Sequence, residues 1–161
     1  MSEQLPTITC VFDRTISDVN DVQYLREKML AQTATAEEKA RWATDLKGAL
    51  NASDLTRIQT NMGIIAGMMG IRINNTPPGE IPNESYFASL LADLRTLYRT
   101  KFIRSDTPAI PESPLNTYQK WNDIERIQYD IFNTYLSNTG DNFNYLRRAD
   151  GMYAGDDIVV I

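Results

Sequence analysis

Charged side chains in two stretches of the chain are the first candidates for chemistry. Asp54 and Arg57 lie in one stretch, and Asp123, Glu125 and Arg126 lie in the other. Paired carboxylates perform acid–base catalysis when they are buried at a suitable separation. A deep pocket joining Asp54, Asp123 and Glu125 would therefore indicate an enzyme. Nothing in the spacing indicates such burial, and we favour structural ion pairs formed by Asp54, Arg57, Asp123 and Arg126.

The residue types that the chain lacks narrow the chemistry further. Its 161 residues include no histidine and one cysteine, Cys10. Because histidine is the commonest general base and transition-metal ligand, catalytic triads, zinc sites and most acid–base schemes are thereby excluded. A single cysteine also excludes an intramolecular disulfide. Cys10 has apolar neighbours and no basic residue beside it to lower its pKa, which argues against a nucleophile. We predict that the protein is not an enzyme and binds no cofactor.

Acidic residues near the end of the chain raise the question of calcium. Asp141, Asp150, Asp156 and Asp157 offer oxygen ligands, which calcium prefers. Their spacing fits no EF-hand loop. The sequence therefore favours a solvated acidic tail over a metal site, and calcium binding stays open as the alternative.

Charge and hydropathy exclude two classes of partner. The formal net charge is −5, and the 16 lysines and arginines are scattered. Binding to a phosphate backbone needs clustered positive charge, so we expect no nucleic-acid partner. The longest apolar run, residues 62–71, is interrupted by glycines and is shorter than the ~18 residues of a membrane span. Because the first residues also lack a secretory pattern, we expect cytoplasmic synthesis and no membrane partner.

Apolar residues at helical spacing predict a mainly α fold. The predicted helices are residues 18–31, 36–47, 53–69, 84–98 and 118–137. Thr35 with Glu38 forms a capping-box pattern, and Asn83 is a helix-capping residue. Proline-rich segments at residues 71–82 and 105–115 predict loops.

The two ends of the chain have a different composition. Residues 7–12 are β-branched and apolar and predict a short strand, and residues 141–161 predict an extended tail. Free strand edges recruit strands from neighbouring subunits. The alternative is that the ends pack on their own domain. The candidate partner-binding residues are Thr7, Thr9, Val11, Phe12, Phe143, Tyr145, Tyr153, Ile158 and Val160. Between strand and first helix, the Asp-Arg-Thr motif at residues 13–15 either fixes the strand against a partner or is a helix cap with a solvated Arg14.

The length and hydrophobic fraction of 42% suit a single domain, residues 1–161, with a compact bundle of about five helices. Residues 53–59 resemble residues 122–128, since both read small polar, Asp, apolar, any, Arg, Ile, Gln. This similarity suggests two related helical halves, residues 18–70 and 83–139. In a sharper version, the Asp of one copy pairs with the Arg of the other. The alternative is chance similarity between two amphipathic helices.

Several motifs also resemble a known group of proteins. They are Phe-Asp-Arg-Thr at residues 12–15 with Ser-Asp-Val at 17–19, residues 46–55 with Arg57, and Tyr118 with Trp-Asn-Asp-Ile-Glu at 121–125. In this order and spacing they resemble a domain of structural and tail-associated proteins of phages and prophages of Firmicutes, over roughly residues 8–136. The resemblance implies a virion component, although this chain carries no receptor-binding region after its tail.

The expected function is therefore that of a bacteriophage virion structural protein in the tail, baseplate, neck or head surface. It would act by contacts with other virion proteins and with copies of itself, without a small-molecule substrate. The alternative is a non-viral helical adaptor or regulatory protein without catalysis.

Overall fold

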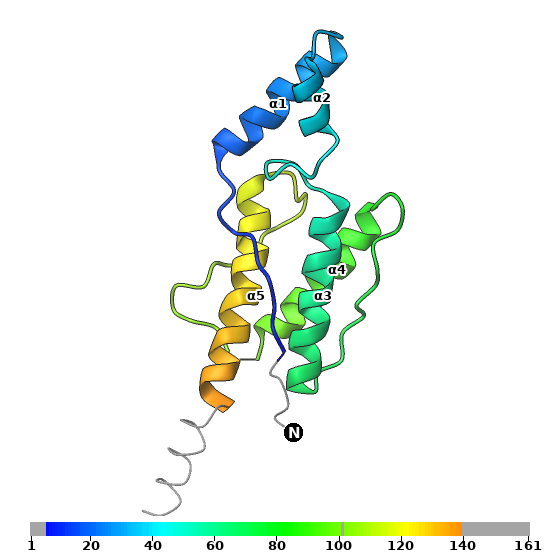
Figure 1. Cartoon of the computed structure of the whole chain (residues 1–161). Coiled ribbons are helices and arrows are strands. Elements are labelled where there is room, and N and C mark those ends of the chain that lie inside the picture. Colours follow the sequence, from blue (N-terminus) through cyan, green and yellow to red (C-terminus); the bar gives the residue numbers. More distant parts are fainter. Residues whose placement is uncertain (1–5, 101, 140–161) are drawn as a thin grey trace, which may run out of the picture.

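The computed structural model describes residues 6–100 and 102–139, and within them every regular element is a helix. Five helices follow one another along the chain. They are α1 (Ile16–Leu30), α2 (Ala36–Trp42), α3 (Ala52–Met69), α4 (Glu84–Tyr98) and α5 (Tyr118–Thr139). The last three pack into a body, from which α1 and α2 project together (Figure 1). We call residues 16–47 the arm.

The three body helices run in the same direction. Near their starts, the rings of Phe87 on α4 and Trp121 on α5 lie 6.0 Å apart. Near their ends, the hydroxyl of Tyr135 on α5 donates to the carbonyl of Met68 on α3 at 2.7 Å. Residues 70–83 and 102–117 therefore return the chain along the outside of the body before the next helix starts (Figure 1).

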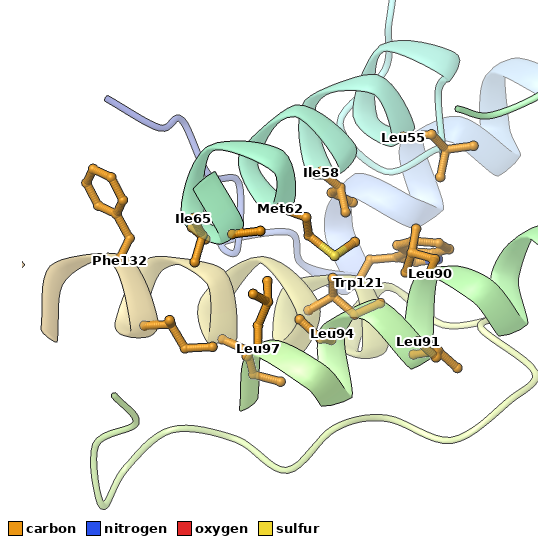
Figure 2. Packing of buried hydrophobic residues seen from close by; sticks show 14 of the residues in the cluster. Leu55, Ile58, Met62, Ile65, Leu90, Leu91, Leu94, Leu97, Trp121 and Phe132 are labelled. Carbon is orange, nitrogen blue, oxygen red and sulfur yellow. The ribbon is translucent and has the colours of Figure 1, made fainter. Parts of the chain in front are cut away.

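One hydrophobic core fills the space between α3, α4 and α5 (Figure 2). Each helix contributes apolar residues three or four positions apart, which places them on one face. Fully burying one such side chain stabilises the fold by about 1.5–3 kcal/mol. The most deeply buried apolar residues of the body are Ile58, Met62, Ile65, Leu94, Leu97, Ile124, Ile127 and Ile131.

Polar residues at the helix starts explain where most of the helices begin. Capping boxes join Thr15 to Asp18 at α1 and Thr35 to Glu38 at α2, and the Asn83 side chain caps α4. These contacts satisfy backbone N–H groups that have no partner inside the helix. The third helix is capped by Asn51 and begins at Ala52, whereas Ser53 was predicted as its cap. The second helix is shorter than predicted, because it ends at Trp42.

The arm is thinly packed. Of residues 16–47, all of which the structure describes, Leu25 alone is buried. Its base is held where Gly48 touches the first turn of α1. A Cβ atom at Gly48 would lie 2.1 Å from the carbonyl oxygen of Asp18, so only glycine fits this approach.

The predicted strand at residues 7–12 is wrong, since this segment is extended but pairs with no strand among the described residues. Together with the residues around it, it lies along α3 and α5 (Figure 1). We call residues 6–15 the strap. Its backbone groups bond to helix side chains in place of a neighbouring strand. The predicted tail, residues 141–161, lies outside the described residues.

Two further features bear on the sequence predictions. The proposed halves share one core, because α3 packs against both α4 and α5. In the part of the chain that the structure describes, no helix is both long and apolar enough to cross a membrane.

Candidate functional site

A buried cluster of charges joins the strap to α3 and α5. At its centre is Glu125, whose side chain is fully buried. Its Oε1 accepts from Arg14 at 2.9 Å and from Arg57 at 2.8 Å. Its Oε2 accepts from the backbone N–H of Val11 at 2.7 Å and again from Arg57 at 3.0 Å. All four donors point at one carboxylate, which accounts for its burial as a charged group.

Asp54 completes the cluster from the first turn of α3. Its Oδ1 accepts from Arg14 at 3.0 Å and from Arg57 at 2.6 Å. Its Oδ2 accepts from the backbone N–H and the side chain of Asn51. Burial by itself raises the pKa of Asp54, but hydrogen bonds from Asn51 and Arg57 outweigh it and hold the pKa below its usual value.

Arg14 is the strap's main anchor. It is 5% exposed, and besides its two carboxylates it donates to the carbonyl of Val11. The side chain of Asn122 accepts from the backbone N–H of Arg14 and donates to its carbonyl. Arg14 is therefore a buried anchor and not the solvated residue that one alternative proposed, while Thr15 beside it caps α1.

The chemistry of this cluster favours structure over proton transfer. A general acid or base needs an oxygen that is free to meet a substrate. Every oxygen of these two carboxylates instead accepts hydrogen bonds from guanidinium, amide or backbone donors of the same chain. Asp123 takes no part in the ion pairs of the described residues. The structure thus brings Asp54 and Glu125 together but not with Asp123.

The predicted ion pairs meet different outcomes. Asp54 pairs with Arg57 as expected. Arg126 pairs with Asp130 at 2.9 Å and with Asp106 at 3.3 Å, instead of with Asp123. Burial raises the pKa of Asp123. The contact between the two similar segments is made by Arg57 and Glu125, so it does not follow the Asp–Arg pairing that the similarity suggested.

Of the candidate partner-binding residues, those in the strap lie against their own chain. Val11 and Phe12 are half-buried, whereas Thr7 and Thr9 are exposed. The Phe12 ring lies 5.2 Å from that of Tyr129, and the Arg126 guanidinium lies 5.5 Å from the Phe12 ring centre. The remaining candidates lie outside the described residues, as do the four acidic residues considered for calcium. They are Phe143, Tyr145, Tyr153, Ile158 and Val160, and Asp141, Asp150, Asp156 and Asp157.

Cys10 lies in the strap, close to Asn61 of α3 and Glu125 of α5. Burial and the nearby Glu125 carboxylate raise the pKa of the Cys10 thiol to about 12. At neutral pH this thiol is therefore protonated and a poor nucleophile. The side chain of Asn61 on α3 donates to the carbonyl of Thr9 at 2.7 Å, and Val11 donates to Glu125, so the strap is fixed on either side of the thiol.

The second candidate site, after the buried cluster, is the outer surface of the arm. Leu30 at its tip is 72% exposed and Ile16 at its base is 59% exposed, and Tyr24 and Trp42 are also exposed. Beside Ile16, a pocket of about 490 Å³ opens between the arm and the start of α5. We call it the base pocket. Its apolar lining residues are Ile16, Val19, Ala49, Leu50, Leu115 and Trp121.

Sequence reasoning missed the central pairings of the buried cluster. Arg14 and Glu125 lie far apart along the chain, and no periodicity connects them. The available signal was a pair of short polar motifs, at residues 13–15 and 122–125. They contain Arg14, Asn122 and Glu125, which the fold brings together. A buried charge requires an opposite charge, but a single sequence does not show which residues are buried.

No protein-family model, curated protein or solved structure shows a significant match to this chain. In the described ranges, no group of three or more cysteine or acidic residues is arranged to hold a metal ion.

Proposed function

We propose that the protein is a structural component of a bacteriophage virion, in the tail, baseplate, neck or head surface, and that it acts by binding other proteins. The observation that carries the protein-binding part is the arm. It projects from a well-packed body and exposes large apolar side chains at both of its ends. Large apolar side chains exposed on a projecting element are available for contacts with other proteins.

The virion part of the proposal is supported by the motifs that resemble phage structural proteins. Those motifs have structural roles in this fold. The Asp-Arg-Thr motif supplies the strap anchor and the α1 cap, Gly48 closes the base of the arm, and Asn122 and Glu125 receive the strap. Residues with such structural roles support a shared scaffold and not a shared reaction. The proposal accordingly includes no catalysis, no cofactor and no small-molecule substrate.

Mass spectrometry of purified particles tests the proposal. Particles induced from the host that carries this sequence are separated by density gradient, and peptides of this chain are quantified against known capsid and tail proteins. We expect the chain to co-sediment with the particles at a fixed ratio. A chain that is abundant in the lysate but absent from every particle fraction would favour the alternative of a non-viral adaptor or regulatory protein.

A further inference from the structure

One face of α1 has an exposed leucine at one end and the base pocket at the other. Residues spaced alternately three and four positions apart share a helix face. On α1 this spacing gives the α1 stripe, defined as Ile16, Val19, Gln23, Arg26 and Leu30. Ile16 and Val19, at one end, line the base pocket, whereas Leu30, at the other end, projects into solvent.

The stripe is nearly symmetric about its midpoint. Gln23 lies seven positions from each end of the stripe, with apolar residues at both ends. When two such stripes pack antiparallel, each Leu30 meets the other copy's Ile16, and the two Gln23 side chains meet at the twofold axis. The helix rise places Ile16 and Leu30 about 21 Å apart. In the antiparallel arrangement, the Leu30 side chain of each copy therefore reaches the base pocket of the other copy.

The sparse packing of the arm indicates that the α1 stripe packs against another surface. Within residues 16–47 Leu25 is the single buried residue, and the surface contacts of Tyr24 with Glu38 and of Arg41 with Asp21 add little. A short helix gains most of its stability from packing of an apolar face. Within one chain, Val19 is half-buried, but Ile16 and above all Leu30 leave most of their apolar surface without such packing.

We propose that two copies of this chain associate through their arms, with the α1 stripes antiparallel and each Leu30 seated in the base pocket of the other copy. This inference rests on the proposed function, to which it adds a self-association surface. The contact is isologous, so it closes on itself as a dimer. The amides of the paired Gln23 residues hydrogen-bond each other and set the register, and the aliphatic stem of Arg26 covers Val19 of the second copy.

The first test is sedimentation velocity on the full chain over a concentration series. We expect a monomer–dimer equilibrium for the native sequence and dimerisation weakened roughly tenfold or more by Leu30→Asp, since a buried anchor residue is lost. Because Leu30 is exposed in the single chain, the thermal midpoint of dilute Leu30→Asp protein falls only slightly, by the small cost of a negative charge at the end of α1. Ile81→Asp is the matched control, since Ile81 is 84% exposed but lies on a loop of the body, and it leaves dimerisation intact.

The second test is disulfide trapping in a Cys10→Ser background. Gln23→Cys places a thiol at the twofold axis, and we expect rapid formation of a covalent dimer. Lys39→Cys places an equally exposed thiol on α2, away from the stripe, and cross-links slowly. A native chain that stays monomeric, a Leu30→Asp variant that dimerises like the native chain, or equal trapping at the two sites would each overturn the proposal. None of these results depends on finding the chain in a virion, so failure here and failure of the proposed function are distinguishable.

Discussion

At the scale of single residues, the fold depends on one arginine. Arg14 is the only buried residue in the strap, and it bridges Asp54 of α3 and Glu125 of α5. A buried ion pair contributes little compared with a well-packed apolar group, but losing one partner is costly because the other charge stays buried. Arg14 therefore matters chiefly through the two carboxylates that it compensates.

We expect Arg14→Ala to lower the free energy of unfolding by about 3–5 kcal/mol, the usual cost of breaking a buried pair. Urea denaturation measures this change. Arg104→Ala is the matched control, since Arg104 pairs with Asp106 at the surface and its loss changes stability by at most about 1 kcal/mol. Equal effects of the two substitutions would show that the cluster does not hold the strap.

The same cluster predicts a dependence of stability on pH. The pKa of Asp54 is lower in the fold than its usual value of 3.8, so the unfolded chain binds this proton more readily. The stabilising contribution is therefore present above pH 3.8 and is lost as the pH falls through the lowered pKa. Urea titrations at decreasing pH should show a steeper loss of stability in the native chain than in Asp54→Asn. Parallel curves would mean that Asp54 is not stabilised as a carboxylate.

The residue scale also shows where sequence reasoning succeeds. The Asp54–Arg57 pair is predictable because both groups lie one turn apart on a helix. The contacts of Arg14 and Arg57 with Glu125 are not predictable in this way, because tertiary packing alone brings those residues together.

At the scale of elements, the helices were predictable and the strap was not. The capping box at Thr35 and the N-cap at Asn83 are local, so their sequence signals identify the helix starts. Residues 7–12 have a strand-like composition because an extended segment with one half-buried face alternates in the same way. Composition does not indicate whether the partner of such a segment is a strand or a pair of helices, and here Asn61 and Glu125 occupy the place of a neighbouring strand.

A glycine substitution tests the junction between arm and body. Gly48→Ala would place its Cβ against the backbone of Asp18, so we expect a loss of stability of roughly 1–3 kcal/mol, typical of overpacking. Gly67→Ala is the matched control on α3. No atom lies within 4 Å of its added Cβ, and alanine favours helix, so this variant should gain up to about 1 kcal/mol. Thermal unfolding by circular dichroism compares the two, and a neutral Gly48→Ala would contradict the close approach.

At the scale of the whole molecule, stability is distributed unevenly. The core of the body contains fully buried residues from α3, α4 and α5, while the arm buries Leu25 alone. Backbone amides exchange with solvent by local opening, and weakly packed elements open first. The mainly α fold was predictable from composition and periodicity. The division into body and arm was not, because both parts have amphipathic helices and differ only in which of them find a partner.

Hydrogen exchange measured by mass spectrometry tests this division. In dilute protein, we expect amides of α1 and α2 to exchange much faster than those of α3 and α5. At concentrations where the dimer forms, α1 should become protected while α4 stays unchanged. Uniform protection of arm and body in dilute protein would show that the arm is stable by itself.

The common direction of the three body helices has a consequence for how quickly the chain folds. Neighbouring antiparallel helices can zip together from a short turn, but α3, α4 and α5 meet only after residues 70–83 and 102–117 have looped back along the molecule. The hydrogen bond from Gln128 to the carbonyl of Ile58 can therefore form only after a long loop has closed. Folding rates fall as native contacts become more distant in sequence. Stopped-flow refolding should accordingly give a slower rate than is usual for helical bundles of this size, closer to that of mixed α/β domains.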